Sequence, residues 1–369
     1  ALPNNSVGYT ERPDMGIFMK EWLALYESKS GERGIFNRAS AQVKAASNGR
    51  RDGSIEFGTN PCCEIILRPY QFCNLSEVIC RADDTIITLK HKIKLATILG
   101  TFQSTLTDFG YLRKRWKNTT EEERLLGLSL TGIMDCPAVY DASPEALQQL
   151  RDVAVKTNKR MAEKLGINQS TAVTCVKPSG TVSQLVDAAS GIHARHNPYY
   201  IRTVRGDNKD PLTMFLKDKG VPSEPDFTAP DNVTVFSFPM KSPEGAICRY
   251  DMGALEQLEL WLKIADNYCE HKPSVTISVK EHEWLEVGAW CWEHFDSLSG
   301  ISFLPFSDHS YKQAPYQDID KEEFKDLTEK MPPAIDWYEL QDYEKEDTTT
   351  GSQELACAGG VCEIVDIGA

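Results

Sequence analysis

The sequence lacks the features of a membrane or secreted protein. None of its apolar runs reaches the roughly 20 residues that cross a bilayer, and its first residues do not resemble a secretory signal. Eleven cysteines without such a signal favour free, functional thiols over a disulfide scaffold. We therefore expect a reducing, cytoplasmic setting and no membrane partner.

Positive charge is also scarce. The chain has 40 Lys and Arg against 54 Asp and Glu, a formal net charge of −14, which argues against a nucleic-acid-binding surface. Any nucleotide site must then be a local pocket of basic groups or backbone amides. No internal repeat is present, and 369 residues with 41% hydrophobic content suit two ordinary domains or one large α/β unit.

Helical and strand-like segments alternate along much of the chain. The expected helices are 16–27, 87–110 (buried), 120–130, 145–165, 181–189, 214–219, 253–270 and 281–295. The expected strands are 171–176, 233–238, 274–279 and 301–305. This alternation predicts an α/β fold with a parallel sheet or barrel.

The most informative stretch is Asn60-Pro61-Cys62-Cys63-Glu64-Ile65, followed by Cys73. Asn-Pro favours a turn, so a thiol and a carboxylate share one loop tip. A neighbouring carboxylate raises a thiol pKa, which disfavours thiolate attack but not hydrogen-atom transfer, and Glu64 has the chemistry of a general base. The alternative is that the clustered cysteines bind zinc or are buried apolar residues, although their spacing matches no usual zinc pattern. That cluster is Cys62, Cys63, Cys73 and Cys80.

This motif, together with Phe72-Cys73-Asn74-Leu75, resembles the finger loop of ribonucleotide reductases. The resemblance implies that Cys62 carries a transient thiyl radical and abstracts the 3′ hydrogen of a ribonucleotide. Glu64 would accept the 3′-hydroxyl proton, Asn60 would hydrogen-bond the substrate, and Cys73 would be half of the reducing dithiol. The implied fold is part of a ten-stranded α/β barrel, with loop 58–75 threading its centre.

A second candidate site is the turn Pro178-Ser179-Gly180-Thr181 between an expected strand and helix. Amide groups at a helix start favour anions, although such turns also occur as plain helix caps. The family binds substrate phosphates with a segment of this kind, which implies that role for Ser179, Gly180 and Thr181. Asn4-Asn5-Ser6 resembles another substrate-side segment and implies a contact from Ser6, although such triplets are also common turns.

The source of the radical distinguishes the classes of the family. No glycyl-radical loop is found, and Tyr199-Tyr200 is better explained as packed aromatics on an edge strand than as a radical relay. The segments 190–202, 271–279 and 301–309 resemble the adenosylcobalamin-dependent (class II) enzymes. The resemblance implies adenosylcobalamin as cofactor and no protein-bound metal. A di-iron-partner (class I) catalytic subunit remains the alternative.

The end of the chain carries Cys357 and Cys362 on an acidic segment that begins near residue 332. Two thiols separated by four small residues close easily into a disulfide, and a flexible segment 332–369 would let them act as a thiol shuttle. The family resemblance implies thioredoxin or a similar reductant as partner. A terminal zinc pair or idle cysteines are the alternatives. The remaining cysteines, expected mostly in the core, are Cys136, Cys175, Cys248, Cys269 and Cys291.

The resemblance covers only the carboxy-terminal portion of the family. No cysteine precedes Cys62 to pair with Cys73, so we expect residues 1–331 to be part of the catalytic barrel and to need a separate amino-terminal portion. The chain would be a split-gene product, a processed piece or a fragment. A non-enzymatic alternative is an inactive half-barrel until that complement arrives.

Overall fold

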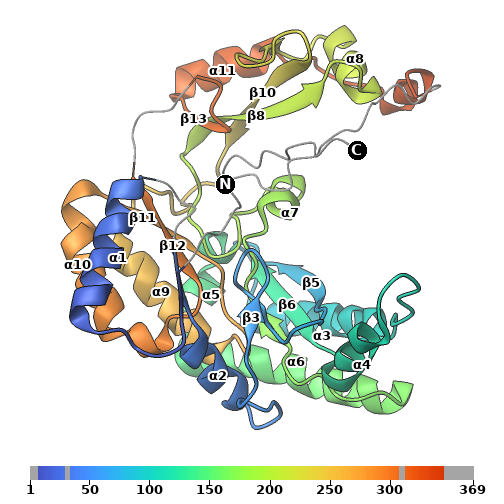
Figure 1. Cartoon of the computed structure of the whole chain (residues 1–369). Helices are drawn as coiled ribbons and strands as arrows, with labels where there is room; N and C mark the ends of the chain where they lie inside the picture. The colour runs from blue at the N-terminus through green and yellow to red at the C-terminus, as the bar shows by residue number, and fades with distance from the viewer. Residues whose placement is uncertain (1–6, 30–33, 307–311, 345–369) are drawn as a thin grey trace, which may run out of the picture. The chain divides into compact units, whose positions relative to one another are not determined.

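The computed structural model describes residues 7–29, 34–306 and 312–344 (Figure 1). The chain divides into two compact units, one of residues 1–194 with 251–306 and the other of 195–250 with 307–369. The expected domain 1–331 therefore contains the whole first unit and part of the second. Within the described ranges, no helix is both long and apolar enough to span a membrane.

The first unit holds most of the strands and helices. Its strands are β1 (Val7–Tyr9), β2 (Gly34–Asn37), β3 (Gly58–Thr59), β4 (Ile66–Leu67), β5 (Asn74–Ile79), β6 (Leu126–Thr131), β7 (Thr174–Cys175), β11 (Thr276–Val279) and β12 (Ile301–Pro305). Its α-helices are α1 (Met15–Ser28), α2 (Arg38–Ala46), α3 (Ile86–Gln103), α4 (Lys114–Glu123), α5 (Pro137–Tyr140), α6 (Pro144–Leu165), α7 (Gly180–Leu185), α9 (Ala254–Asn267) and α10 (Trp284–Glu293). Short 3-10 turns are η1 (Ile133–Asp135), η2 (Glu281–Glu283) and η3 (Phe295–Ser297).

Two sheets of this unit are connected by an isolated β-bridge. Strands β5, β6 and β7 are parallel neighbours, and β11 and β12 are a second parallel pair. A parallel bridge between Val176 and Pro273 connects the end of β7 to the start of the β11 segment. Strand β12 then pairs antiparallel with β2, and β2 pairs parallel with β1. The fold is thus mixed α/β, as the alternating pattern predicts.

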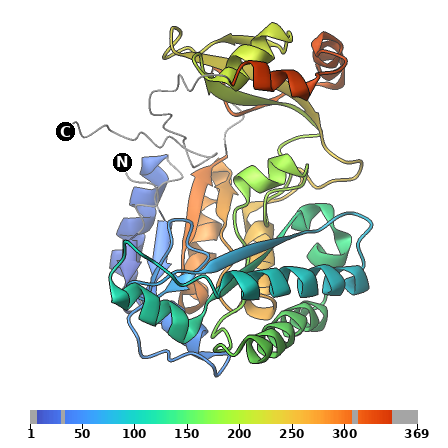
Figure 2. The ribbon, with the colours of Figure 1, turned by 90° about the vertical axis from the view of Figure 1, so that its right-hand side faces the viewer.

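Helices cover the outside of β5 and β6 (Figures 1 and 2). The Ser143 side chain caps α6 by accepting from Ala146 N, and Gly166 ends that helix in the left-handed region. Helix α3 contacts α6 and β5. We expected a buried helix at 87–110, but α3 ends at Gln103 and only one of its faces is covered, since Leu95 is 54% exposed and Phe102 48% exposed.

The expected helix over 120–130 is wrong. Residues Lys114–Glu123 form α4, and Leu126–Thr131 form the buried central strand β6. Glu123 does not act as a capping residue, because its carboxylate pairs with the buried Arg51 instead. Strand β6 is apolar enough on both faces to be buried between helices and the interior, which outweighs local helix propensity.

Most other expected elements are present, with ends shifted by a few residues. The expected helices 16–27, 145–165, 253–270 and 281–295 correspond to α1, α6, α9 and α10, and the strand 301–305 to β12. The expected strand 171–176 is reduced to the two residues of β7, and the helix 181–189 to α7.

The second unit is an antiparallel sheet in the order β13-β8-β10-β9. Its elements are β8 (Tyr199–Asp207), α8 (Pro211–Asp218), β9 (Ser223–Pro225), β10 (Val233–Lys241), β13 (Tyr316–Asp318), α11 (Lys321–Lys330) and η4 (Trp337–Asp342). Tyr199 packs against Phe324 and Tyr200 against Tyr316, as expected for packed aromatics, although β8 is an inner strand rather than an edge.

The expected flexible segment begins too early at residue 332. Trp337 and Tyr343 pack against Phe215 of α8, at ring centroid distances of 5.7 and 5.5 Å. Ile335 and Leu340 join the same cluster. These apolar side chains anchor residues 332–344 despite the acidic composition of the segment as a whole.

Candidate functional site

The Cys62 motif forms the tip of a short hairpin. Strands β3 and β4 pair antiparallel, with Thr59 opposite Ile66, and the tip closes through a hydrogen bond from Cys63 N to Asn60 O of 3.0 Å. Asn60 Oδ1 accepts from Ile65 N at 3.0 Å, so the asparagine side chain fixes the turn from within. The structure thus confirms the loop tip predicted from Asn-Pro.

Glu64 is the buried carboxylate of this tip. It is 1% exposed, and its Oε2 has no hydrogen-bond partner among the described residues. Burial raises the pKa of Glu64, while a hydrogen bond with the Asn60 side chain and the charge of Lys177 oppose that rise. A carboxyl group with a raised pKa and one unsatisfied oxygen is suited to exchange a proton with a ligand near neutral pH.

The thiols around Glu64 differ in exposure. Cys63 is buried, whereas Cys62 and Cys73 are partly exposed as whole residues, although the Cys73 sulfur itself lies in the interior. Burial raises the pKa of Cys63 to about 11, and burial followed by the Glu64 charge raises the pKa of Cys73 well above its usual value. Cys63 and Cys73 therefore stay protonated at neutral pH, which suits hydrogen-atom or proton transfer better than thiolate attack.

A buried ion pair anchors the second half of loop 58–75, at Ile66 and Gln71. Arg51 Nη2 lies 2.9 Å from Glu123 Oε2, and Arg51 Nη1 donates to Ile66 O at 2.9 Å. Gln71 Nε2 donates to Glu123 Oε2 at 2.5 Å, and Gln71 Oε1 accepts from Arg68 N at 2.9 Å. Local sequence does not predict this network, because Thr120 and Glu123 match the pattern of a helix-capping box.

His271 attaches the hairpin to the sheet. Its Nδ1 accepts from Ile66 N at 3.3 Å, and its Nε2 donates to Leu126 O at 3.0 Å, an arrangement that requires the neutral ring. Burial lowers the pKa of His271 to about 3, so the ring remains neutral at physiological pH. The next residue, Lys272, donates from its backbone N to Glu64 O at 3.0 Å. No sequence motif assigns either residue an individual role, and only their place in segment 271–279 pointed to them.

The expected phosphate turn leads into α7. Ser179 has φ 56° and ψ 36°, the left-handed region that a serine rarely adopts. It is 4% exposed, and its Oγ is buried without a hydrogen-bond partner among the described residues. A buried, unpaired hydroxyl costs free energy, so a ligand that accepts from Ser179 Oγ would recover it. Gly180 is partly exposed and Thr181 is exposed.

The structure brings this turn and the hairpin tip together. Lys177, two residues before Ser179, acts electrostatically on Glu64. Cys175 of β7 is fully buried, and burial followed by the charges of Glu64 and Cys73 raises its pKa well above the usual value. The hairpin tip, Cys73 and the start of the phosphate turn therefore surround one interior region of the first unit. Three other candidate residues, Ser6, Cys357 and Cys362, lie outside the described residues.

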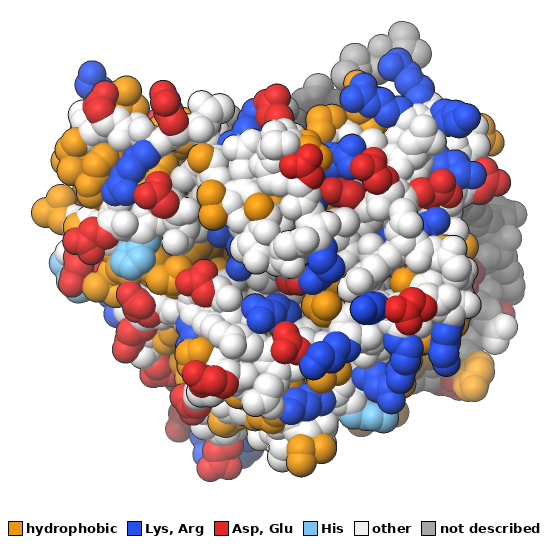
Figure 3. Space-filling model, turned by 90° about the horizontal axis from the view of Figure 1, so that it is seen from below, with side chains coloured by type: hydrophobic (Ala, Val, Ile, Leu, Met, Phe, Trp, Pro, Cys, Tyr) orange, Lys and Arg blue, Asp and Glu red, His pale blue; other side chains and the backbone are white. Residues whose placement is uncertain are grey.

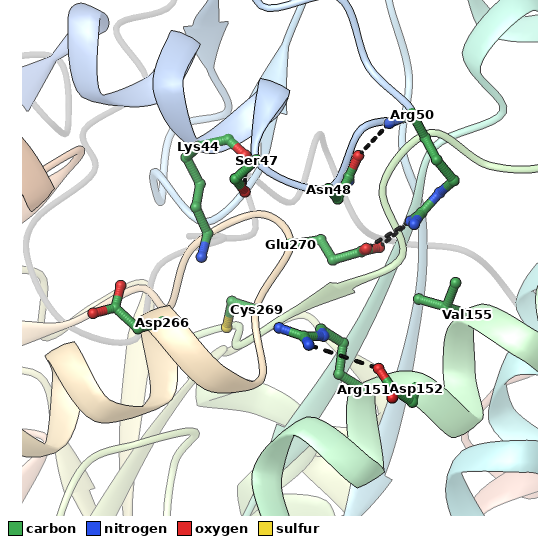
Figure 4. A pocket seen from close by; sticks show the side chains of 10 residues that line it. All are labelled: Lys44, Ser47, Asn48, Arg50, Arg151, Asp152, Val155, Asp266, Cys269 and Glu270. Atoms are coloured by element: carbon green, nitrogen blue, oxygen red, sulfur yellow. Dashed lines mark hydrogen bonds and ion pairs between the residues drawn. The ribbon is translucent and has the colours of Figure 1, made fainter. Parts of the chain in front are cut away.

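The best-formed cavity of the described residues lies elsewhere (Figure 4). It has a volume of about 220 Å³, and basic and acidic side chains from α2, α6 and the end of α9 point into it. Arg50 pairs there with Glu270, and Glu270 Oε2 accepts from Val173 N, just before β7. The cavity thus lies at the amino end of β7, whereas the phosphate turn follows its carboxyl end. Its charges are largely paired with one another, so we assign it no ligand.

Surface charge supports a local rather than an extended anion site. On the face seen in Figure 3, basic and acidic side chains are interspersed. Such a mixture creates no extended field of one sign.

Comparisons with known proteins point to one group of enzymes. No protein-family model matches the chain. The adenosylcobalamin-dependent ribonucleoside-triphosphate reductase of Lactobacillus delbrueckii subsp. bulgaricus is 27% identical over an alignment of 379 residues. The alignment covers 91% of this chain and 50% of that enzyme. The Euglena gracilis enzyme of the same name is 28% identical over 316 residues, covering 82% of this chain and 42% of the relative.

Solved structures agree on the fold. A B12-dependent (class II) ribonucleotide reductase has a TM-score of 0.75 at 24% identity, covering 94% of this chain and 52% of that one. The class Id ribonucleotide reductase alpha subunit of Actinobacillus ureae has a TM-score of 0.51 at 15% identity. The mixed α/β fold is thus that of the class II reductase structure. The chain is a homologue of adenosylcobalamin-dependent (class II) ribonucleotide reductases that spans about half the length of these relatives.

Proposed function

We propose that this chain is the carboxy-terminal part of a class II ribonucleotide reductase and reduces ribonucleotides to 2′-deoxyribonucleotides when its amino-terminal complement is present. The observation that supports this most strongly is the convergence of the Cys62–Glu64 tip with the Ser179 turn, through Lys177. A hydrogen-abstracting thiol, a proton acceptor and a phosphate site are the groups that this reaction requires. The curated relatives carry the name of this activity.

In the proposed reaction Cys62, as a thiyl radical, abstracts the 3′ hydrogen atom while Glu64 takes the 3′-hydroxyl proton. Asn60 holds the Glu64 carboxylate by a hydrogen bond and would also bind the substrate. Cys73 and a cysteine of the amino-terminal portion supply two electrons for loss of the 2′-hydroxyl as water. Ser179, Gly180 and Thr181 hold the phosphates, and Ser6 is proposed as a further substrate contact.

The hairpin 58–67 is proposed as the finger loop of a barrel. A Cβ at Gly127 of β6 would lie 2.9 Å from Ile65 Cδ1, and a Cβ at Gly300 would lie 2.4 Å from Cys63 Cβ. The tip therefore packs tightly against β6 and against the residue that precedes β12. Strands β6 and β12 lie on opposite sides of the Val176–Pro273 bridge. A loop enclosed by a curved sheet is expected to contact strands on both sides in this way.

The amino-terminal portion is proposed to complete that barrel along β5 and α3. Strand β5 is an edge strand, and a cavity of about 300 Å³ lies between it and α3. Beside this edge, Leu95, Leu99 and Phe102 of α3 are 54%, 65% and 48% exposed. An unpaired strand edge beside exposed apolar side chains favours association with another polypeptide.

Adenosylcobalamin is proposed as the source of the radical, and thioredoxin or a similar dithiol as the reductant that acts through Cys357 and Cys362. The two best-formed cavities, about 220 and 300 Å³, are too small for a corrinoid, which exceeds drug-sized ligands. Contacts with the cofactor therefore lie outside these cavities. A radical taken from a metal-containing partner subunit is the second candidate, favoured only by the weaker fold match to a class Id subunit.

The deciding experiment measures deoxynucleotide formation with adenosylcobalamin and a small dithiol. This chain alone, the chain with a separately produced amino-terminal portion, and the same mixture with Cys62→Ser are compared. Product only in the mixture with the native cysteine supports the proposal. Absence of product from a folded complex rejects the cobalamin assignment, and product that instead requires a metal-loaded partner subunit supports the second candidate.

A further inference from the structure

Two buried cysteines outside the proposed active site lie side by side. Cys80 directly follows β5, and its backbone N donates to Thr131 O at the end of β6 at 2.8 Å. Gly132 then turns with φ 75°, and a Cβ there would lie 2.4 Å from Cys80 O. The η1 turn brings the chain back, so that the thiol of Cys136 lies near the thiol of Cys80 and the two interact.

The two thiols are chemically unequal. The hydrogen bond from Cys80, followed by backbone N–H groups of Ala138 and Val139, lowers the pKa of Cys136. The same hydrogen bond and burial raise the pKa of Cys80 well above its usual value. Because the thiolate is the nucleophile, Cys136 is suited to attack an oxidant and Cys80 to resolve the product.

The pair is not part of a metal site within the described residues, where no group of three or more metal-ligating side chains occurs. Both thiols are fully buried. An oxidant must therefore be small enough to enter the interior during local opening. Hydrogen peroxide meets this requirement.

We propose that Cys80 and Cys136 are a redox-modifiable dithiol that hydrogen peroxide converts to an intramolecular disulfide. The Cys136 thiolate attacks one peroxide oxygen, the O–O bond breaks, and hydroxide leaves and is protonated to water, which gives a sulfenic acid. The sulfur of Cys80 then attacks the Cys136 sulfur, the S–O bond breaks, and a second water leaves with the Cys80 proton. Two thiols are oxidised by two electrons and one peroxide is reduced.

The disulfide would restrain the segment that follows the phosphate turn. Closure brings the two sulfur atoms to a bonded distance of about 2.05 Å. Arg81, next to Cys80, donates to Asp187 O at 2.7 Å, while Gly132 N donates to Ala189 O at 2.8 Å. Asp135, next to Cys136, accepts from Ala189 N at 2.7 Å. Residues next to each cysteine thus form hydrogen bonds with the segment 186–191.

The existence of the dithiol does not depend on the reductase assignment. Only its effect on substrate phosphates rests on the proposed function, because α7 links residues 186–191 to the Ser179 turn. Oxidation would then restrain the phosphate turn while leaving Cys62 and Cys73 unchanged.

The test is peptide mapping after peroxide treatment of the full chain. Free thiols are alkylated under denaturing conditions, and the unreduced digest is analysed by mass spectrometry. We expect a Cys80–Cys136 linked peptide that dithiothreitol separates. Cys291→Ala, which removes another fully buried thiol, should retain the link, and Cys136→Ala should leave Cys80 alkylated.

Recovery of both cysteines in alkylated form from the native chain, under peroxide that closes Cys357–Cys362, would overturn the proposal. So would a link from Cys80 to any other cysteine. Neither outcome depends on turnover or on the folding of a variant, so failure here is distinguishable from failure of the proposed function.

Coupling to the phosphate turn is tested by hydrogen exchange. Amides of 186–191 should exchange about fivefold more slowly in the oxidised native chain, because a cross-link removes locally open states. Peroxide-treated Cys136→Ala should show no such slowing. Unchanged exchange in the oxidised native chain would overturn the coupling.

Discussion

Arg51 and Glu123 form an ion pair inside the first unit, with 2.9 Å between Nη2 and Oε2 and a fully buried Arg51 side chain. Arg51 also binds the backbone of Ile66, and Glu123 binds Gln71, so the pair holds the second half of loop 58–75. Burying two charges costs several kcal/mol each, which their attraction must offset. The role of the pair is therefore to position the loop more than to stabilise the fold.

Removal of one partner should be strongly destabilising. Glu123→Ala leaves the Arg51 guanidinium buried without its counter-ion, and we expect a loss of about 3–5 kcal/mol in the free energy of unfolding. Urea denaturation measures it. The control is Glu122→Ala, which removes a 63% exposed carboxylate paired with Arg68 and should cost at most about 1 kcal/mol. Equal losses in the two variants would contradict the role of the buried pair.

Glu64 should make stability depend on pH. Because burial raises the pKa of Glu64, the native state prefers the protonated form. The stability gained from the protonated Glu64 carboxyl is complete below the pKa that Glu64 has in the unfolded chain. It is lost as the pH rises through the pKa that Glu64 has in the native state. Glu64→Gln should therefore be more stable than the native chain at pH 7, by about 1.4 kcal/mol for each pH unit between the two pKa values, and lose that advantage near pH 4.

Denaturation curves at several pH values measure this dependence. The matched control is Glu286→Gln, which changes an exposed carboxylate on α10 and should follow the native profile. A constant difference between Glu64→Gln and the native chain across pH 4–8 would argue against a raised pKa.

Ser179 should affect substrate binding more than folding. Its Oγ is buried and has no hydrogen-bond partner in the described part of the chain, so Ser179→Ala removes an unsatisfied group and should leave stability unchanged or slightly increased. Loss of a hydrogen bond to a phosphate should raise KM about 10- to 100-fold in the complemented enzyme. Thr120→Val, which also deletes a buried unpaired hydroxyl, should leave KM unchanged. The proposed phosphate role fails if the two variants show the same KM.

The terminal cysteines should matter only for the protein reductant. Cys357→Ser removes one thiol of the proposed shuttle, so thioredoxin-driven turnover of the complemented enzyme should fall to background. Turnover with a small dithiol, which reaches the active-site disulfide directly, should persist. Steady-state assays with each reductant make the comparison. Loss of both activities would reject the shuttle.

The exposed face of α3 should determine association with the amino-terminal portion. Leu99→Glu places a charge on a 65% exposed apolar position beside β5, and we expect Kd to rise at least about tenfold, or ~1.4 kcal/mol. Leu285→Glu changes an even more exposed leucine on α10 and should leave Kd unchanged. Titration calorimetry measures both, and equal weakening would place the interface elsewhere.

The hairpin tip and its chemistry can be predicted from local sequence. Asn60 and Pro61 form a turn because of their local backbone preferences, and the turn places Cys62 and Glu64 together whatever surrounds them. Local signals also located helices such as α6, where Ser143 and Gly166 supply both caps. Interactions within a few residues carry this information, so it can be recovered without knowledge of the fold.

Other features of the fold and of the site depend on tertiary contacts. Strand β6 replaced an expected helix because its residues are buried on both faces, and residues 332–344 are ordered because Trp337 and Tyr343 pack on Phe215. Three further features depend on residues that are far apart in the chain. They are the burial that raises the pKa of Glu64, the neutral ring of His271 and the contact between Cys80 and Cys136. Desolvation and long-range pairing depend on which segments meet, and local sequence preferences do not contain that information.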